Sequence, residues 1–213
     1  MKRRDFSVAA LAACTMGQSV HAQGNKKPKE GIEYVSLDKR VPTEVADGKV
    51  EVIEFFWYSC PHCNAFEPRF SSWIKAVSKD VVVKRVPVRF RDDFEPQQRA
   101  YYVFEALNMV DAMHGKLFHA IHTERQTLNT LASLAAWAAK NGLPAQKFTE
   151  TYNSFGVVSK AKRATQLQEA FKVQGVPALG VAGRFYTDGS LAGSMERAVQ
   201  TMDFLLAEVR RGK

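Results

Sequence analysis

The chain has 213 residues, of which 46% are hydrophobic, and its formal net charge is +8. This length and composition suit one globular domain, or one domain with an insertion. No dense cluster of Lys and Arg with interleaved aromatic residues accompanies the charge, so we expect no nucleic-acid binding. We interpret the charge as promoting solubility, with a mild preference for acidic partners or membrane surfaces.

Residues 1–22 have the pattern of a secretory signal peptide. A basic start is followed by a mostly apolar segment and by a small-residue cleavage site ending at Ala22. Two alternatives are a twin-arginine signal at Arg3-Arg4 and a lipoprotein cleavage box ending at Cys14. The second would leave a lipid anchor on Cys14, whereas cleavage after Ala22 removes that cysteine. Beyond this segment, nothing is long and apolar enough to span a membrane.

The next elements are short until the first apolar run. Residues 23–31 are polar and rich in lysine, which predicts a flexible lead-in. Residues 32–35 favour a short edge strand, and residues 41–48 contain the Pro, Asp and Gly typical of a connection. Residues 50–57 are apolar, aromatic and β-branched, which predicts a buried central strand.

A helix pattern follows that strand and begins with two cysteines. The four residues at its start are, in order, Cys60, Pro61, His62 and Cys63. Apolar residues at helical spacing extend the predicted helix to about residue 78, with a kink expected at Pro68. A second strand is predicted over 81–88. Strand, helix and strand in this order predict a βαβ unit with a parallel pair.

A long helical tract separates this unit from the remaining strands. Its predicted helices cover residues 97–107, 111–123, 129–140, 144–152 and 157–171. Because a βαβ crossover needs only one helix, most of this tract is predicted to be an inserted layer. Strands at 177–181 and 184–186 are then joined by two residues, as in a hairpin. Ser194 is placed to cap a final helix over 195–210.

The two thiols are the first candidates for chemistry. Helix starts carry unpaired N–H groups and a partial positive charge, which lower the pKa of a thiol there, and the thiolate is the reactive form. We therefore expect Cys60 to be an exposed nucleophile, and Cys63, one turn further in, to be the buried resolving thiol. Pro61 fits the first helical turn, and His62 can stabilise a thiolate, which makes the disulfide oxidising.

A zinc site is the alternative for two cysteines at this spacing. Structural zinc needs four ligands, and no second cysteine pair is present. His114, His119 and His122 lie in a predicted helix, where surface or partner-bonded histidines are the common outcome. We therefore favour redox chemistry and expect no metal.

Three charged residues and one proline complete the candidates. Glu54 interrupts the central strand, where burial would raise the pKa of its carboxyl. We interpret it as a proton carrier for Cys63; the alternative is a carboxyl salt-bridged at the sheet edge. Glu67 and Arg85 can form a supporting pair. Pro177 opens a predicted strand, a position from which proline is normally excluded and which a cis peptide would accommodate.

Three stretches resemble the DsbA family of thioredoxin-fold thiol:disulfide oxidases. They are Glu54-Phe55-Phe56-Trp57-Tyr58-Ser59-Cys60-Pro61-His62-Cys63 with Phe66-Glu67, Gly175-Val176-Pro177-Ala178, and Tyr152-Asn153-Ser154-Phe155. The resemblance covers nearly all of residues 32–210. It implies an α/β thioredoxin fold in two parts, residues 32–94 and 173–213. A helical domain, residues 95–172, is inserted between the βαβ and ββα halves.

The resemblance also implies a role for each candidate. Cys60 would be the attacked and attacking sulfur, and Cys63 the resolving one. His62 would stabilise the thiolate, and Glu54 would be the buried acid. The backbone of Val176, beside cis-Pro177, would face a substrate strand.

The implied activity is disulfide donation in the periplasm. Reduced exported proteins would be the substrates, a membrane quinone-linked oxidase of the DsbB type would regenerate a monomeric enzyme, and the Cys60–Cys63 disulfide would need no cofactor. A disulfide reductase or isomerase, or a thiol-based metal or peptide carrier, remains the alternative. The chain departs from the family at Arg85, where many members have Lys, and at residues 179–183, which are smaller than usual.

Overall fold

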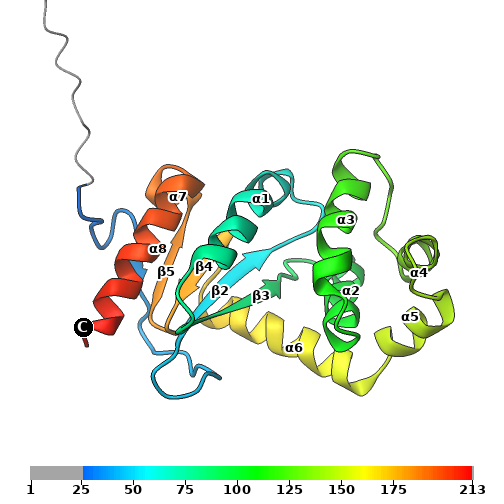
Figure 1. Cartoon of the computed structure of the whole chain (residues 1–213), viewed down its shortest axis with the longest axis horizontal. Helices are drawn as coiled ribbons and strands as arrows, with labels where there is room; N and C mark the ends of the chain where they lie inside the picture. The colour runs from blue at the N-terminus through cyan, green and yellow to red at the C-terminus, as the bar shows by residue number, and fades with distance from the viewer. Residues whose placement is uncertain (1–25, 213) are drawn as a thin grey trace, which may run out of the picture.

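The computed structural model describes residues 26–212 (Figure 1). The predicted signal peptide, with its cleavage site at Ala22 and the alternative lipid anchor at Cys14, lies outside the described residues. In the part of the chain from 26 to 212, no helix has both the length and the apolar character needed to cross a bilayer.

Five strands form one mixed sheet in the order β1-β5-β4-β2-β3. Their bounds are Val35–Ser36 for β1, Val50–Phe56 for β2, Val81–Pro87 for β3, Ala178–Val181 for β4 and Phe185–Asp188 for β5. β2 pairs in parallel with β3 and antiparallel with β4. All seven residues of β2 are buried, so the predicted central strand is confirmed.

Helices cover both faces of this sheet, as the alternation of side chains along β2 requires. Val50 and Val52 share a core with α1 (Pro61–Ala76) and α8 (Met195–Arg210). Ile53 and Phe55 belong to the core on the other face, where Phe55 packs against Phe171, 5.2 Å between ring centroids, at the end of α6. Glu54 therefore shares the face of Val50 and Val52, directed toward α1.

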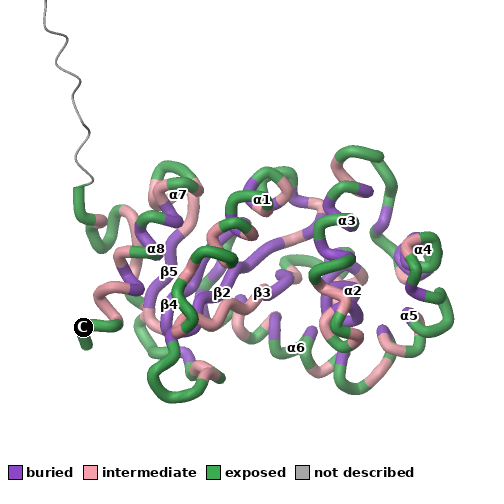
Figure 2. Tube along the Cα trace, in the orientation of Figure 1, coloured by how far each residue is buried: buried purple, intermediate pink, exposed green. Residues whose placement is uncertain are grey.

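The helical tract lies between β3 and β4, as predicted, beside the sheet in Figure 1. Its elements are η1 (Asp92–Phe94), α2 (Glu95–Ala106), α3 (Val110–His122), α4 (Leu131–Lys140), α5 (Ala145–Tyr152) and α6 (Phe155–Ala170). α2 is its centre, because it contacts α3, α4, α5 and α6. Seven of the 12 residues of α2 are buried. Figure 2 shows exposed stretches along α4 and α5. α6 also contacts β3 and so joins the insertion to the sheet.

Several local predictions differ from the structure. The predicted short edge strand is present as β1 at the edge of the sheet, but its bounds differ from the expected 32–35. A turn closed by the Gly31 N–H and the Tyr34 carbonyl leaves Ile32 60% exposed, and β1 begins only at Val35. The predicted flexible lead-in is attached to the fold at Lys26, because Arg197 of α8 donates to the Lys26 carbonyl at 2.6 Å. The predicted helix that includes Pro68 is present as α1, and the kink expected at Pro68 stays a prediction. A four-residue helix, α7 (Gly189–Ala192), has no periodic signal and was not predicted.

The predicted hairpin between β4 and β5 is present, but three residues, 182–184, separate its strands instead of two. The Arg184 N–H donates to the Val181 carbonyl at 2.9 Å, and the two central residues of this turn, Ala182 and Gly183, both have positive φ angles, 55° and 63°. The Gly183 carbonyl also accepts the Val41 N–H at 2.8 Å. A Cβ atom at Gly183 would overlap the carbonyl oxygen of Val41. The small residue here is therefore required by the close passage of the Val41 backbone.

This contact can be tested by substituting glycines of similar φ. Gly48 has a φ of 78° and open space around its Cα, so Gly48→Ala carries only the cost of a left-handed residue. We expect Gly48→Ala to lower the free energy of unfolding by about 1 kcal/mol, and Gly183→Ala by about 3 kcal/mol or more because of the additional overlap. Denaturant unfolding of both variants measures the difference. Equal losses would show that the Val41 backbone moves away without cost.

Candidate active site

The two cysteines lie at the start of α1, just after the loop that connects it to β2. Cys60 is the N-cap residue of the helix, with extended backbone angles, and its carbonyl accepts the Asn64 N–H at 3.1 Å. Pro61 takes the first helical position, where a missing N–H costs nothing. The Cys60 sulfur is therefore held at the end of α1 that carries the partial positive charge.

Both cysteines carry free thiols, and their burial is unequal. Cys63 is fully buried, and Cys60 is only 8% exposed. Cys60 is less accessible than the sequence predicted, because the segment around Val176 covers it. The Cys60 sulfur lies 3.4 Å from the Val176 carbonyl oxygen, to which it donates when it is protonated, and the two residues are 116 positions apart.

The local environment separates the two thiols chemically. The pKa of Cys60 is lowered to about 6, first by a hydrogen bond from the Cys63 thiol and then by backbone N–H groups and the charge of His62, against the effect of burial. The pKa of Cys63 is raised, mainly by burial. At neutral pH Cys60 is a thiolate and Cys63 a neutral thiol, which is the asymmetry that thiol–disulfide exchange uses.

A groove opens beside these thiols. The Val176–Pro177 peptide is cis, as predicted. Pro177 is buried, whereas Val176 is partly exposed. The groove has a volume of about 420 Å³, and the exposed His62 lies at its edge. Its other lining residues are Gly175, Val176, Pro177, Asp188, Gly189, Ser190, Gly193 and Met195. An extended chain in this groove would pass beside the backbone of Val176.

Behind the thiols, the carboxyl group of Glu54 is hydrogen-bonded to the guanidinium of Arg85. The parallel register of β2 and β3 sets Glu54 opposite Arg85, and Arg85 Nε donates to Glu54 Oε2 at 3.1 Å. Burial raises the pKa of Glu54 to about 8, although the charge of Arg85 opposes the shift. The negative charge of Glu54 also contributes to the raised pKa of Cys63. Glu54 is therefore both salt-bridged and close enough to influence Cys63, and it lies in a central strand and not at a sheet edge.

The predicted pair of Glu67 and Arg85 is present as well. Arg85 Nη2 donates to Glu67 Oε1 at 2.7 Å, and the Ser71 hydroxyl donates to the same oxygen at 2.5 Å. Burial raises the pKa of Glu67, but His114, Arg85 and Ser71 together outweigh it and leave that pKa lowered. One guanidinium thus serves two carboxylates.

The sequence did not reveal how the insertion holds the segment before Cys60. From α3, His122 Nε2 donates to the Tyr58 carbonyl at 2.8 Å, and His114 Nδ1 lies 2.8 Å from the Tyr58 hydroxyl. From α2, Gln97 accepts the Ser59 N–H at 3.2 Å. In the sequence, each of these contacts is marked only by a polar residue on the apolar face of a predicted helix. That pattern does not identify the residue to which the side chain will bond. His114, expected as a surface or partner-bonded residue, is buried and partner-bonded: it is only 4% exposed and contacts the Tyr58 hydroxyl.

No three His, Cys, Asp or Glu side chains gather at metal-binding range within residues 26–212.

Comparisons with known proteins relate this arrangement to one family. A sequence model described as "DSBA-like thioredoxin domain" matches residues 85–200. The thiol:disulfide interchange protein DsbA of Bordetella parapertussis is 40% identical over 210 residues, 98% of this chain and 97% of the relative. The protein of the same name from Pseudomonas aeruginosa is 36% identical over 180 residues, 84% of this chain and 85% of the relative.

Solved structures agree in fold as well as in sequence. The crystal structure of Pseudomonas aeruginosa DsbA matches with a TM-score of 0.82 and 34% identity, covering 87% of this chain and 96% of that one. The crystal structure of the oxidoreductase DsbA from Xylella fastidiosa matches with a TM-score of 0.81 and 28% identity, covering 87% and 100%.

The asymmetry of the thiols predicts a distinct titration. We expect the ultraviolet absorbance of a thiolate to appear with a pKa of about 6 in the reduced protein and to be absent from Cys60→Ser. Cys63→Ala should raise that pKa, because it removes the hydrogen bond that contributes most to the shift. Absorbance titrations of the three proteins check this. A Cys60 titration close to that of a free thiol would contradict the arrangement.

Proposed function

We propose, from the premise that this chain belongs to the DsbA family of thiol:disulfide interchange proteins, that it is an exported oxidase of protein thiols. The chain is a disulfide oxidoreductase by that membership. The proposal concerns the direction of the reaction, its compartment and its partners. The enzyme donates the Cys60–Cys63 disulfide to reduced proteins that are folding in the periplasm.

The observation that carries the direction is the lowered pKa of Cys60 beside the raised pKa of Cys63. A stabilised thiolate lowers the free energy of the reduced protein at neutral pH. The disulfide gains nothing from the same environment, because it has no charge to stabilise. The reduced form is therefore favoured, which makes the disulfide a strong oxidant.

The reaction proceeds through two exchanges. A substrate thiolate attacks the Cys60 sulfur, the Cys60–Cys63 bond breaks, and the leaving Cys63 sulfur takes a proton, for which Glu54 is the proposed donor. The second substrate thiolate then attacks the substrate sulfur of the mixed disulfide, and Cys60 leaves as a thiolate. The substrate loses two electrons and two thiol protons, and the cysteine pair gains the two electrons.

The groove beside cis-Pro177 is the proposed substrate site. An extended peptide laid along Val176 would pair with backbone groups and leave its side chains to the groove, which suits clients of varied sequence. His62 at the edge of the groove would lie next to the substrate sulfur. Because the Val176 carbonyl already lies 3.4 Å from Cys60 Sγ, a strand bound there would bring its own sulfur near the attacked atom.

The proposed setting follows from the N-terminal sequence and the family. Residues 1–22 would direct export, and the mature enzyme would act as a monomer in the periplasm without nucleic acid. A membrane quinone-linked oxidase of the DsbB type would accept the electrons from the dithiol. The redox centre is the cysteine pair itself, with no further cofactor.

A redox titration against glutathione tests the direction. We expect the reduced form to predominate in mixtures of reduced and oxidised glutathione in which a structural disulfide stays oxidised, because such disulfides have potentials below roughly −300 mV. Alkylation of free thiols followed by mass measurement gives the reduced fraction. A potential in that reducing range would overturn the oxidase proposal in favour of a reductase. Stoichiometric metal that protects both thiols would support a carrier.

The role of Glu54 is tested on the opening of the disulfide by a small thiol. Since the pKa of Glu54 is about 8, its proton is present below that pH and lost above it. We expect Glu54→Gln to lower the rate constant, counted per reagent thiolate, by about a hundredfold below pH 8, and the deficit to vanish above it. Stopped-flow fluorescence measures this rate.

The matched control is Glu51→Gln. Glu51 is the other buried carboxylate of β2, 3% exposed and paired with Lys84 at 2.7 Å, and the alternation of the strand places it on the opposite face. The variant Glu51→Gln should therefore leave the rate of disulfide opening unchanged. Equal effects of the two variants would assign Glu54 a structural role only.

A further inference from the structure

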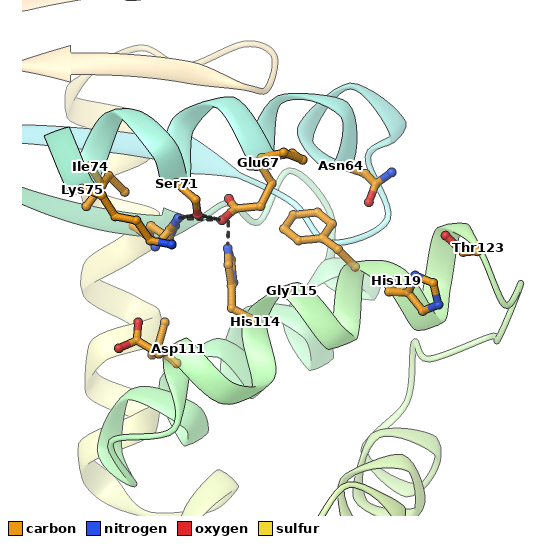
Figure 3. A pocket seen from close by; sticks show the side chains of 14 residues that line it. Asn64, Glu67, Ser71, Ile74, Lys75, Asp111, His114, Gly115, His119 and Thr123 are labelled. Atoms are coloured by element: carbon orange, nitrogen blue, oxygen red, sulfur yellow. Dashed lines mark hydrogen bonds and ion pairs between the residues drawn. The ribbon is translucent and has the colours of Figure 1, made fainter.

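A second groove, of about 710 Å³, lies between α1 and α3 (Figure 3). Its walls are one face of each helix, and it shares no lining residue with the groove at cis-Pro177. In Figure 3 the side chain of Glu67 points down from α1 and the ring of His114 points up from α3, so that the two meet between the helices. None of the residues proposed to touch substrate lies in this groove.

His114 and Glu67 leave two polar atoms without regular partners there. His114 Nε2 and Glu67 Oε2 are 3.3 Å apart, yet neither makes an aligned hydrogen bond with any described residue. His114 is 4% exposed. Because Nε2 faces a carboxylate, we assign the ring proton to Nε2, and Nδ1 then accepts the hydroxyl of Tyr58. Protonation of the ring would require that Nδ1–Tyr58 contact to reverse, which a hydroxyl permits by rotation.

Charged and titratable groups surround His114 from every element packed against it. Glu67 comes from α1 and Arg85 from β3, and Glu54 of β2 lies on the far side of Arg85. The neutral phenols of Tyr58 and Tyr101 complete the set. Two carboxylates share one guanidinium, and Arg85 does not release its proton. The cluster is therefore neutral only when it holds one more proton. Glu54, whose charge influences Cys63, and His114, which lines the groove, are the two places at which that proton can be held.

We infer that His114 takes up a proton from the α1–α3 groove when Glu54 gives its proton to the departing Cys63 sulfur. This rests on the proposed role of Glu54. The departing Cys63 thiolate takes the proton of the Glu54 carboxylic acid, which leaves a Cys63 thiol and a Glu54 carboxylate. A proton from solvent converts the His114 imidazole to imidazolium. The buried cluster begins and ends the step neutral.

The coupling is electrostatic and runs through Arg85 and Glu67. A net negative charge left in a buried cluster is costly because solvent is not there to stabilise it. Burial lowers the pKa of His114, although Glu67 opposes the shift. A new negative charge on Glu54 would favour the imidazolium and so act in the same direction as Glu67. His114 does not touch the reacting sulfur, so it is a positioning residue for charge. The groove lets the compensating proton arrive without crossing the bound substrate.

The test compares His114→Gln with His119→Gln in the oxidised enzyme. His119 is an exposed histidine of the same helix that also lines the groove but faces Glu124, at 3.5 Å. We expect His114→Gln to slow disulfide opening by a small thiol about tenfold at pH 6 to 7 and not above pH 9, where Glu54 has already lost its proton. His119→Gln should match the wild type over the whole range.

A double variant separates this role from a structural one. If His114 acts through Glu54, Glu54→Gln with His114→Gln should be no slower than Glu54→Gln alone. Additive losses would overturn the inference. If Glu54→Gln slows opening and His114→Gln does not, the inference fails while the proposed role of Glu54 stands. If Glu54→Gln has no effect, both fail.

A measurement on the unaltered residue covers the case in which His114→Gln does not fold. We expect the ring signals of His114, followed by NMR in the oxidised protein, to titrate in two steps, one of them shared with Glu54. Glu54→Gln should remove that step and leave the other. A single His114 titration that is the same in both proteins would overturn the inference.

Discussion

One negative charge, on the sulfur of Cys60, sets the requirements that the rest of the site meets. The charge lies at the start of α1, where backbone N–H groups have no partners within the helix, and the Cys63 thiol donates to it. The same burial that keeps Cys63 neutral makes it a donor and not a competitor for the charge. Pro61 supports the geometry by beginning the helix directly after the nucleophile.

The helical insertion is part of this site and not only a cover. The three residues Gln97, His114 and His122 contact Tyr58 and Ser59, which connect β2 to the nucleophile. A shift of α2 or α3 would therefore move the backbone that carries Cys60. His114 also connects this segment to the buried charges of Glu67 and Arg85, so position and charge are controlled through the same contacts.

Sequence patterns predicted what depends on near neighbours. The apolar run of β2, the cysteines at the start of α1 and the Ser194 cap of α8 are local signals, and each was located correctly. The pairing of Arg85 with Glu67 followed from the expected βαβ unit. The burial of Cys60 did not follow from it, because the covering Val176 lies 116 positions away.

Other parts could not be read from the sequence, for physical reasons. A buried polar residue such as Gln97 or His114 has the same spacing as its apolar neighbours, and its partner is chosen by how helices pack. The edge strand begins later than expected because the N–H groups of Gly31, Ile32 and Glu33 bond within a local turn and not to β5, with which the chain pairs from Val35. The short α7 follows from the capping of Asp188 and not from a periodic pattern.

The strand order also determines the order in which the parts of the site come together. β2 lies between β3, which soon follows it, and β4, which comes only after the whole helical insertion. During synthesis, which begins at the N-terminus, Cys60 and Cys63 therefore emerge long before Val176 and β4 are available to pack beside them. The groups that lower the pKa of Cys60, namely Cys63, His62 and their backbone N–H groups, are already present in this first part of the chain. The later part adds the carbonyl that lies against Cys60 and the groove beside it, so accessibility of the sulfur is set last.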